Sequence, residues 1–199
     1  MRKLGIKIAE IFKAHKNIAK TVNNGQTDRF LDILKEKADR TTLTLSLAEL
    51  ISHLYAFYQK PVVVLIDEYD SPVIEAYQNG YHEEMIDFMR EWFGGGPKHV
   101  EGQSIFRAII TGIRRITRES IFSDLNNLKV CSILTPSSFV DKFGFTKPEV
   151  KKVLADVQLS DKSSDVQEWY NGYKFGNTVT VYNPWSVVNL YSTCWTAVA

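Results

Sequence analysis

Three carboxylates follow directly on a short apolar run. Residues 62–66 read Val-Val-Val-Leu-Ile, and Asp67, Glu68 and Asp70 occupy three of the next four positions. An apolar run without alternation predicts a strand buried on both faces, as in parallel sheets. Open α/β sheets bind ligands at the carboxyl ends of their strands, and clustered carboxylates repel one another unless a cation or polar substrate balances them. We therefore expect a metal or polar-ligand site at this point.

Nucleotide hydrolysis is the chemistry that such a carboxylate pair serves. Asp67 would hold Mg²⁺ through its water shell, and Glu68 would orient or deprotonate the attacking water. Asp70 is predicted to join Asp67 in binding the cofactor. The structural alternative for Asp67 and Glu68 is a strand-end turn or a helix N-cap.

A hydroxyl and several arginines follow a second apolar run, residues 105–110. Thr111 comes at the end of this predicted strand, and Arg115 and Arg118 follow within two helical turns. A threonine hydroxyl could contact the γ-phosphate or the attacking water, and an arginine could stabilise the charge that develops on the phosphate. Thr111, Arg115 and Arg118 are therefore candidate catalytic residues beside Glu68.

Helices and strands that alternate along residues 1–135 predict an α/β core. The pattern predicts a third strand at 130–134. It also predicts four amphipathic helices: one at 3–20, one that follows the polar residues 21–28 and ends near 37, one from Ser46 to 58, and one at 81–93. Ser46-x-x-Glu49 has the form of a capping box, which places a helix start at Ser46. The apolar stripe from Met85 to Phe93 indicates core packing. Gly94-Gly95-Gly96-Pro97 reads as a flexible connection, because a phosphate-binding loop needs a strand before it and Lys-Ser/Thr after it.

Residues 136–199 have a different pattern, which predicts a small helical lid with a β-hairpin. Thr146-Lys147-Pro148-Glu149 is a capping box with proline in the first turn. Residues 173–175 and 179–182 predict the two strands of a hairpin. Asn183-Pro184 predicts the start of a final helix.

Composition excludes several classes of protein. The chain has 199 residues, a formal net charge of +1 and 44% hydrophobic residues, which suits a globular core and gives no general attraction to nucleic acid or anionic membranes. Two distant cysteines indicate a reducing compartment, and no apolar run approaches the about 20 residues of a membrane span, so we expect a cytoplasmic protein. The four histidines lack the spacing of zinc ligands.

Several segments together resemble the predicted AAA-ATPase-like family of bacterial proteins, over roughly residues 45 to 191. Residues 62–74 are similar to its Walker B segment, and the other segments that match in order are 111–116, 120–128, 143–146, 169–173 and 182–186. The resemblance implies a partial P-loop NTPase (AAA-like) parallel sheet flanked by helices and followed by the lid. It further implies ATP and Mg²⁺ as cofactors, and an oligomer is possible. In this family the module often precedes a PD-(D/E)XK nuclease-like domain, which makes nucleic acid a possible partner.

The chain departs from the family in one respect. No G-x-x-x-x-G-K-[ST] motif or shorter Gly-Lys-Ser/Thr occurs in the sequence, so the Walker A loop that cradles phosphates is missing. In the family the Walker A strand lies between the sensor strand and the last strand. We therefore expect a fragment of an ATPase that is inactive by itself.

Three other functions are compatible with parts of the pattern. Asp67-Glu68-Tyr69-Asp70 fits the DExD form of helicase-like motors, which however need a Walker A motif and a Ser-Ala-Thr element. A metal-dependent nuclease would need an E-x-K or D-x-K strand, which neither predicted strand supplies. The third alternative is a non-catalytic interaction module that presents aromatic side chains to a partner: Trp92, Phe93, Trp169 and Trp185.

Overall fold

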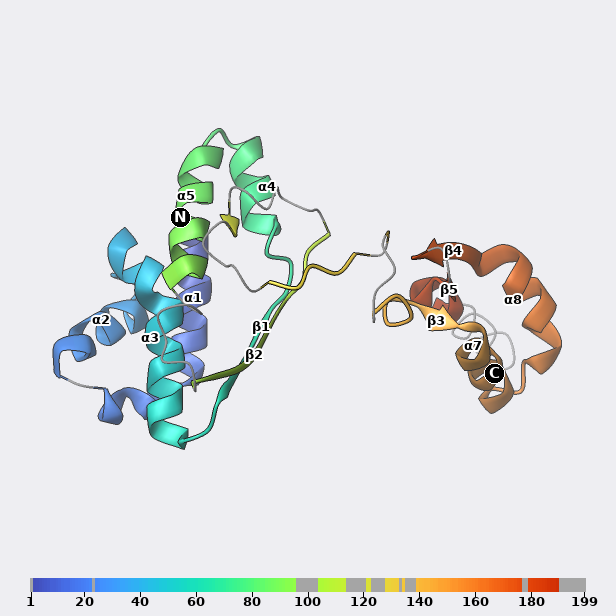
Figure 1. Cartoon of the computed structure of the whole chain (residues 1–199), viewed down its shortest axis with the longest axis horizontal. Helices are drawn as coiled ribbons and strands as arrows, with labels where there is room; N and C mark the ends of the chain where they lie inside the picture. The colour runs from blue at the N-terminus through green and yellow to red at the C-terminus, as the bar shows by residue number, and fades with distance from the viewer. Residues whose placement is uncertain are drawn as a thin grey trace. The chain divides into compact units, whose positions relative to one another are not determined.

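The computed structural model describes residues 2–22, 24–95, 104–113, 121–122, 128–132, 134, 139–176 and 179–189. The chain divides into two units, Met1–Leu128 and Lys129–Ala199 (Figure 1). The first unit carries a parallel pair of strands among helices, and the second carries a small antiparallel sheet. The mixed α/β class predicted from the sequence is confirmed at this level.

Helices make up most of the described part of the first unit. They are α1 (Arg2–Ala14), the 3₁₀ helix η1 (Lys16–Thr21), α2 (Asn24–Leu34), α3 (Arg40–Tyr58), α4 (Ser71–Gln78) and α5 (His82–Gly95). Helix α3 is central, since it contacts α1, α2, η1 and α5. Their apolar stripes meet in one core, whose fully buried members include Phe12, Ile18, Phe30, Ile33, Phe88 and Phe93. The apolar stripe of α5 is therefore core, as predicted.

The central helix begins at Arg40, so the predicted start at Ser46 is wrong. Asp39 is the N-cap, and its carboxylate accepts the backbone N–H of Thr42 at 2.7 Å. Ser46 lies within the helix, where its hydroxyl donates to the carbonyl of Leu43 at 2.7 Å. A serine can bond back to its own helix in this way, so its presence does not by itself mark a helix start.

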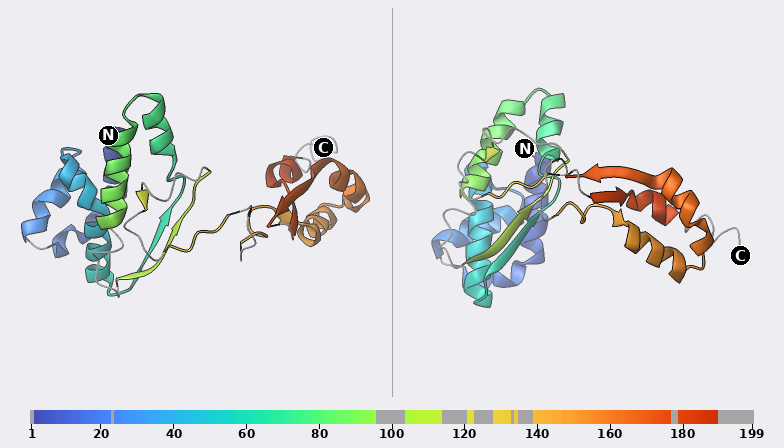
Figure 2. Two further views of the ribbon diagram at one scale, coloured as in Figure 1. Left: turned by 45° about the horizontal axis from the view of Figure 1, so that its top comes forward. Right: turned by 45° about the vertical axis from the view of Figure 1, so that its right-hand side comes forward.

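Two parallel strands, β1 (Val62–Ile66) and β2 (Ile105–Ile110), form the sheet of the first unit, with Val64 opposite Ala108 and Ile66 opposite Ile110. Figures 1 and 2 show α1, α2, α3 and α5 on one side of this pair. Val64 is buried, whereas Val63 and Leu65 are 52% and 70% exposed. The prediction of burial on both faces is wrong, because within the described part of this unit helices cover the sheet on one side.

The third predicted strand, at 130–134, is not formed in its described residues. Val130, Cys131 and Ser132 belong to no helix or strand, and Val130 and Leu134 are 51% and 80% exposed. A strand needs a neighbour for its backbone N–H and C=O groups. The described sheet of the first unit consists of β1 and β2 alone and does not include this segment.

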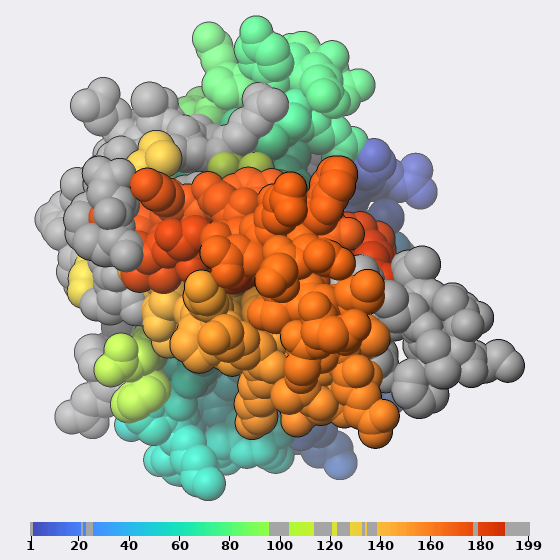
Figure 3. Space-filling view, turned by 90° about the vertical axis from the view of Figure 1, so that its right-hand side faces the viewer, coloured from blue at the N-terminus to red at the C-terminus, as the bar shows by residue number. Residues whose placement is uncertain are grey.

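The second unit combines β3 (Phe145–Thr146), β4 (Asn171–Phe175) and β5 (Val179–Tyr182) with helices α7 (Lys147–Asp156), η2 (Ser160–Lys162), α8 (Ser163–Tyr170) and residues 184–189. The strand order is β3-β5-β4, all antiparallel neighbours, so the predicted hairpin is confirmed. In Figure 3 the orange atoms of α7, α8 and β4 lie on the visible face of this unit together with redder atoms from later in the chain. The core of this unit contains Val150, Leu154, Val166, Tyr182 and Val187.

Two predicted helix starts in this unit are also confirmed. The side chain of Glu149 accepts the backbone N–H of Thr146 at 2.8 Å, as a capping box requires. The Asn183 side chain accepts the backbone N–H of Ser186 at 3.2 Å and caps the helix at 184–189. In neither unit is a described helix long and apolar enough to cross a membrane.

Candidate functional site

The carboxyl ends of β1 and β2 lie side by side, and their hydrogen bonding continues beyond both strands (Figure 2). The backbone N–H of Thr111 donates to the carbonyl of Ile66 at 2.8 Å, and that of Tyr69 donates to the carbonyl of Thr111 at 3.1 Å. Parallel pairing thus brings the residues after the two strands to one edge of the sheet. Asp67 and Thr111, 44 positions apart in the sequence, meet there.

Asp67 is exposed, and one oxygen of its carboxylate is held in place. Its Oδ1 accepts the Thr111 hydroxyl and the backbone N–H of Glu68, the latter at 2.9 Å. A carboxylate can only accept, so the hydroxyl donates its proton to Asp67 and keeps its own lone pairs for another donor. Among the described residues, Oδ2 has no hydrogen-bond partner. Such a carboxylate fits a magnesium ion, which prefers oxygen ligands and keeps much of its water shell.

Glu68 has an unusual backbone conformation for its position. Its φ is 52°, in the left-handed region, between a strand and a helix. The other non-glycine residues in this region, Glu36, Gln59 and Gln158, directly follow helices or lie one turn residue beyond them. The exposed Glu68 carboxylate accepts the Ser71 hydroxyl at a long 3.4 Å, and its carbonyl accepts the Ser71 backbone N–H at 3.0 Å. The turn therefore leaves the Glu68 carboxylate exposed at a cost in backbone energy.

Asp70 differs from the other two carboxylates because it is buried, with 1% of its surface exposed. Its Oδ1 accepts the backbone N–H of Ile113 at 3.3 Å, and its carbonyl accepts the N–H groups of Val73 and Ile74 in the first turn of α4. Its predicted role as a cofactor ligand stays a prediction. Arg115 and Arg118 lie outside the described residues.

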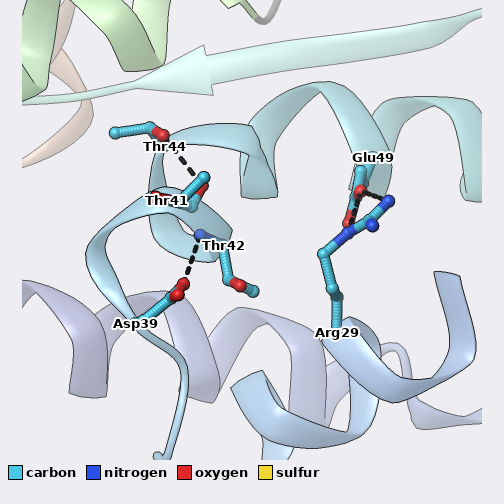
Figure 4. A network of polar contacts seen from close by, with 6 residues as sticks. All are labelled: Arg29, Asp39, Thr41, Thr42, Thr44 and Glu49. Atoms are coloured by element: carbon cyan, nitrogen blue, oxygen red, sulfur yellow. Dashed lines mark hydrogen bonds and ion pairs between the residues drawn. The ribbon is translucent and has the colours of Figure 1, made fainter.

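A second polar group is buried in the helical layer, where Arg29 of α2 meets α3. The Arg29 Nε donates to Glu49 Oε1 at 2.7 Å (Figure 4), and the hydrogen bond raises the pKa of Arg29. Burial lowers the pKa of His53, one turn further along α3, while the Glu49 charge opposes and the Arg29 charge adds to this shift. Within the described part of the chain, Glu49 Oε2 and His53 Nε2 have no hydrogen-bond partner.

No role was predicted from the sequence for Gly112, which stands between Thr111 and Ile113. A Cβ added there would lie 2.5 and 2.7 Å from Tyr69 ring carbons and 2.8 Å from Asp70 Oδ1. A glycine directly after the strand-end threonine was the signal that could have identified it, since glycine often marks close backbone approach.

Comparison with known protein families identifies the family of this chain. The profile of the family described as "Predicted AAA-ATPase" matches residues 5–122, more than half of the 199 residues. This chain belongs to the Predicted AAA-ATPase family. The family assignment from sequence motifs is thus confirmed, although the match begins earlier than the expected residue 45 and ends before 191. The matched range includes every predicted site residue.

One relative shares more of the chain. The protein described as "Uncharacterized protein in vnfD 5'region" from Azotobacter chroococcum mcd 1 is 30% identical over 147 residues. The aligned region is 72% of this chain and 27% of that relative, so the chain spans only a part of the relative's length. No solved structure matches.

Proposed function

We propose that this chain carries the metal-binding and water-activating half of the ATP hydrolysis site of a P-loop ATPase. The hydrogen bond between Asp67 and Thr111, across the carboxyl ends of two adjacent parallel strands, carries the proposal. In P-loop ATPases an acidic residue at the end of a strand helps to hold Mg²⁺. The membership in a family described as Predicted AAA-ATPase supports the same assignment.

In this proposal Asp67 holds the magnesium ion through water. A magnesium ion held there would supply positive charge that balances negative charge on the phosphates of ATP. The two hydrogen bonds to Oδ1 hold the carboxylate in one orientation. A carboxylate held in this way loses less conformational freedom on binding.

Glu68 would act on the attacking water. The water oxygen forms a bond to the γ-phosphorus, the bond from the γ-phosphorus to the bridging oxygen breaks, and ADP leaves with that oxygen. Glu68 accepts the proton that the water loses. The Thr111 hydroxyl donates to Asp67 and can therefore accept a hydrogen bond from the same water.

The remaining parts of the site would come from other residues. Arg115 and Arg118 are proposed to stabilise charge on the transferred phosphate. The sequence contains no Gly-Lys-Ser/Thr, so a phosphate-binding loop would be supplied by residues outside these 199, in a protein longer than this chain. We predict that the 199-residue chain by itself binds ATP weakly or not at all and does not hydrolyse it. A nuclease-like domain, a nucleic-acid partner and oligomerisation stay predictions from the resemblance.

The decisive variant is Glu68→Gln in the protein that includes the phosphate-binding loop. We expect ATP hydrolysis to be lost while binding of Mg²⁺-ATP, measured by calorimetry, is retained. Glu36→Gln is the matched control, because Glu36 is also a glutamate with positive φ, 58°, and its side chain pairs with Lys13. Unchanged hydrolysis in Glu68→Gln would refute the assignment. Tight Mg²⁺-ATP binding by the 199-residue chain, lost in Asp67→Ala, would refute the prediction that it is inactive alone.

A second candidate function, a non-catalytic interaction module, is favoured by two exposed tryptophans. Trp169 and Trp185 of the second unit are 76% and 75% exposed. Trp92 and Phe93 do not belong to such a surface, because Phe93 is fully buried and the Trp92 indole donates to Ser46 at 3.0 Å. Specific Mg²⁺-ATP binding by the longer protein would favour the ATPase over this alternative.

A further inference from the structure

Asp70 links the two segments that carry the candidate catalytic groups. Its carboxylate accepts the Ile113 N–H in the loop after β2, at 3.3 Å. Its backbone carbonyl accepts the Val73 and Ile74 N–H groups, at 3.1 and 2.9 Å, where α4 begins. One residue thus connects the turn after β1, the first turn of α4 and the loop after β2.

The loop after β2 has no room for displacement towards this turn. A side chain at Gly112 would collide with the Tyr69 ring and with Asp70 Oδ1, as the 2.5 and 2.8 Å separations show. The Tyr69 ring also packs against Phe122, with ring centroids 5.2 Å apart. The backbone of Gly112 therefore lies flat against residues 69 and 70.

We infer that Asp70 is a positioning residue, which holds Gly112 and Ile113 against the turn after β1 and so keeps the Thr111 hydroxyl on Asp67. Asp70 is 1% exposed, whereas Asp67 and Glu68 are exposed. A carboxylate that is buried and hydrogen-bonded to backbone is suited to fix a loop, whereas a ligand of Mg²⁺-ATP must reach the nucleotide. The effect of Asp70 on catalysis rests on the proposed function, whereas its role in holding the loop after β2 does not.

Hydrogen exchange of the 199-residue chain tests the structural part directly. In Asp70→Ala the Ile113 amide loses its acceptor, so its exchange should become about two- to tenfold faster, with a similar trend at the Tyr69 amide. The Thr42 amide, which is held by Asp39 in the same unit, should not change. Asp39→Ala is the matched control and should have the reverse pattern, with faster exchange at the Thr42 amide and an unchanged exchange rate at the Ile113 amide.

Asp70→Asn keeps an acceptor oxygen and a similar shape, so it should restore slow exchange at Ile113. This variant also decides the result if Asp70→Ala loosens the whole unit and speeds exchange at Thr42 as well. Unchanged exchange at Ile113 in Asp70→Ala would overturn the inference. Fast exchange at Ile113 in Asp70→Asn, with Thr42 still protected, would overturn it too.

ATP hydrolysis by the longer protein tests the catalytic part. A shifted Thr111 should lower kcat by about 10- to 100-fold in Asp70→Ala, with the Mg²⁺ concentration for half-maximal rate unchanged, and Asp70→Asn should recover most of the rate. If Asp70 were a ligand, Asp70→Asn would instead raise the Mg²⁺ requirement as Asp67→Asn does, and the inference would be wrong. A wild-type protein without ATP hydrolysis would refute the proposed function, while the exchange data would still decide the role of Asp70.

Discussion

Gly112→Ala is the substitution whose effect follows most directly from the structure. The added methyl group would lie 2.5 and 2.7 Å from carbons of the Tyr69 ring. An ordinary carbon–carbon contact is about 3.5 to 4 Å, so the ring or the loop has to move by about 1 Å. Gly112 does not have a left-handed backbone, since its φ lies outside that range, and the effect is therefore steric rather than conformational.

Tyr69 cannot absorb this displacement of about 1 Å by moving its side chain alone. Tyr69 packs against the core of the first unit and against Phe122, and its backbone N–H is bonded to the Thr111 carbonyl. Overpacking of this kind costs about 1–3 kcal/mol. With a urea dependence of about 2 kcal/mol per molar, the unfolding midpoint of the first unit should fall by roughly 0.5–1.5 M.

Trp92 can report this transition selectively, because the other tryptophans, Trp169, Trp185 and Trp195, belong to the second unit and can be changed to phenylalanine. Fluorescence of Trp92 in urea then follows the first unit alone. Gly95→Ala is the control, since its Cβ would have only an ordinary contact, 3.9 Å from the Thr44 carbonyl. A midpoint for Gly112→Ala equal to that of Gly95→Ala would refute the close packing described above.

Three further predictions concern stability. Glu49→Ala should destabilise the first unit by about 1–2 kcal/mol in urea, which is less than for a fully buried pair because the Arg29 side chain is 38% exposed. The control Glu10→Ala, at an exposed pair with Lys7, should change the stability by no more than about 0.5 kcal/mol. Equal effects of the two substitutions would contradict the pairing of Glu49 with Arg29. Burial lowers the pKa of His53 below its ordinary 6.5, so the unfolded chain binds the proton more readily than the folded one. The free energy of unfolding of the first unit should therefore be highest above pH 6.5 and fall by up to about 1.4 kcal/mol per pH unit below it. His53→Leu should flatten this dependence in urea titrations, and an unchanged slope would argue against it. Glu68→Gly should stabilise the first unit by about 1 kcal/mol, because glycine adopts the positive φ of residue 68 without strain, and Gln158→Gly should do the same for the second unit. Only Glu68→Gly should abolish ATP hydrolysis in the longer protein. A loss of stability in Glu68→Gly would show that Glu68 is not strained.

The local signals in the sequence predicted the structure where neighbouring residues decide it. The capping box at Thr146 and Glu149 and the Asn183 cap depend on hydrogen bonds within one turn, and both are formed. The same signal failed at Ser46, because its hydroxyl bonds to Leu43 within a helix that Asp39 had already started.

The burial of a strand is harder to predict from its own residues than a helix cap. Residues 62–66 have the uniform apolar character of a strand covered on both faces, yet Leu65 is 70% exposed among the described residues. A sequence states what a strand can bury, while the surrounding elements decide what it does bury. The predicted strand at 130–134 likewise has strand-forming residues but no described neighbour with which to pair.

For the candidate site, the sequence by itself determined the chemical groups: an aspartate and a glutamate after one strand and a threonine after the next. Their types and order predict a nucleotide site, whereas the family was predicted from several segments that match in order along the chain and is confirmed by the family comparison. Only the tertiary structure decided how the groups differ. Parallel pairing brings Thr111 onto Asp67, Glu68 lies exposed in a left-handed turn, and Asp70 is buried and accepts the Ile113 backbone N–H. The contacts of Asp67 with Thr111 and of Asp70 with Ile113 join residues more than forty positions apart, which no local pattern of residues specifies.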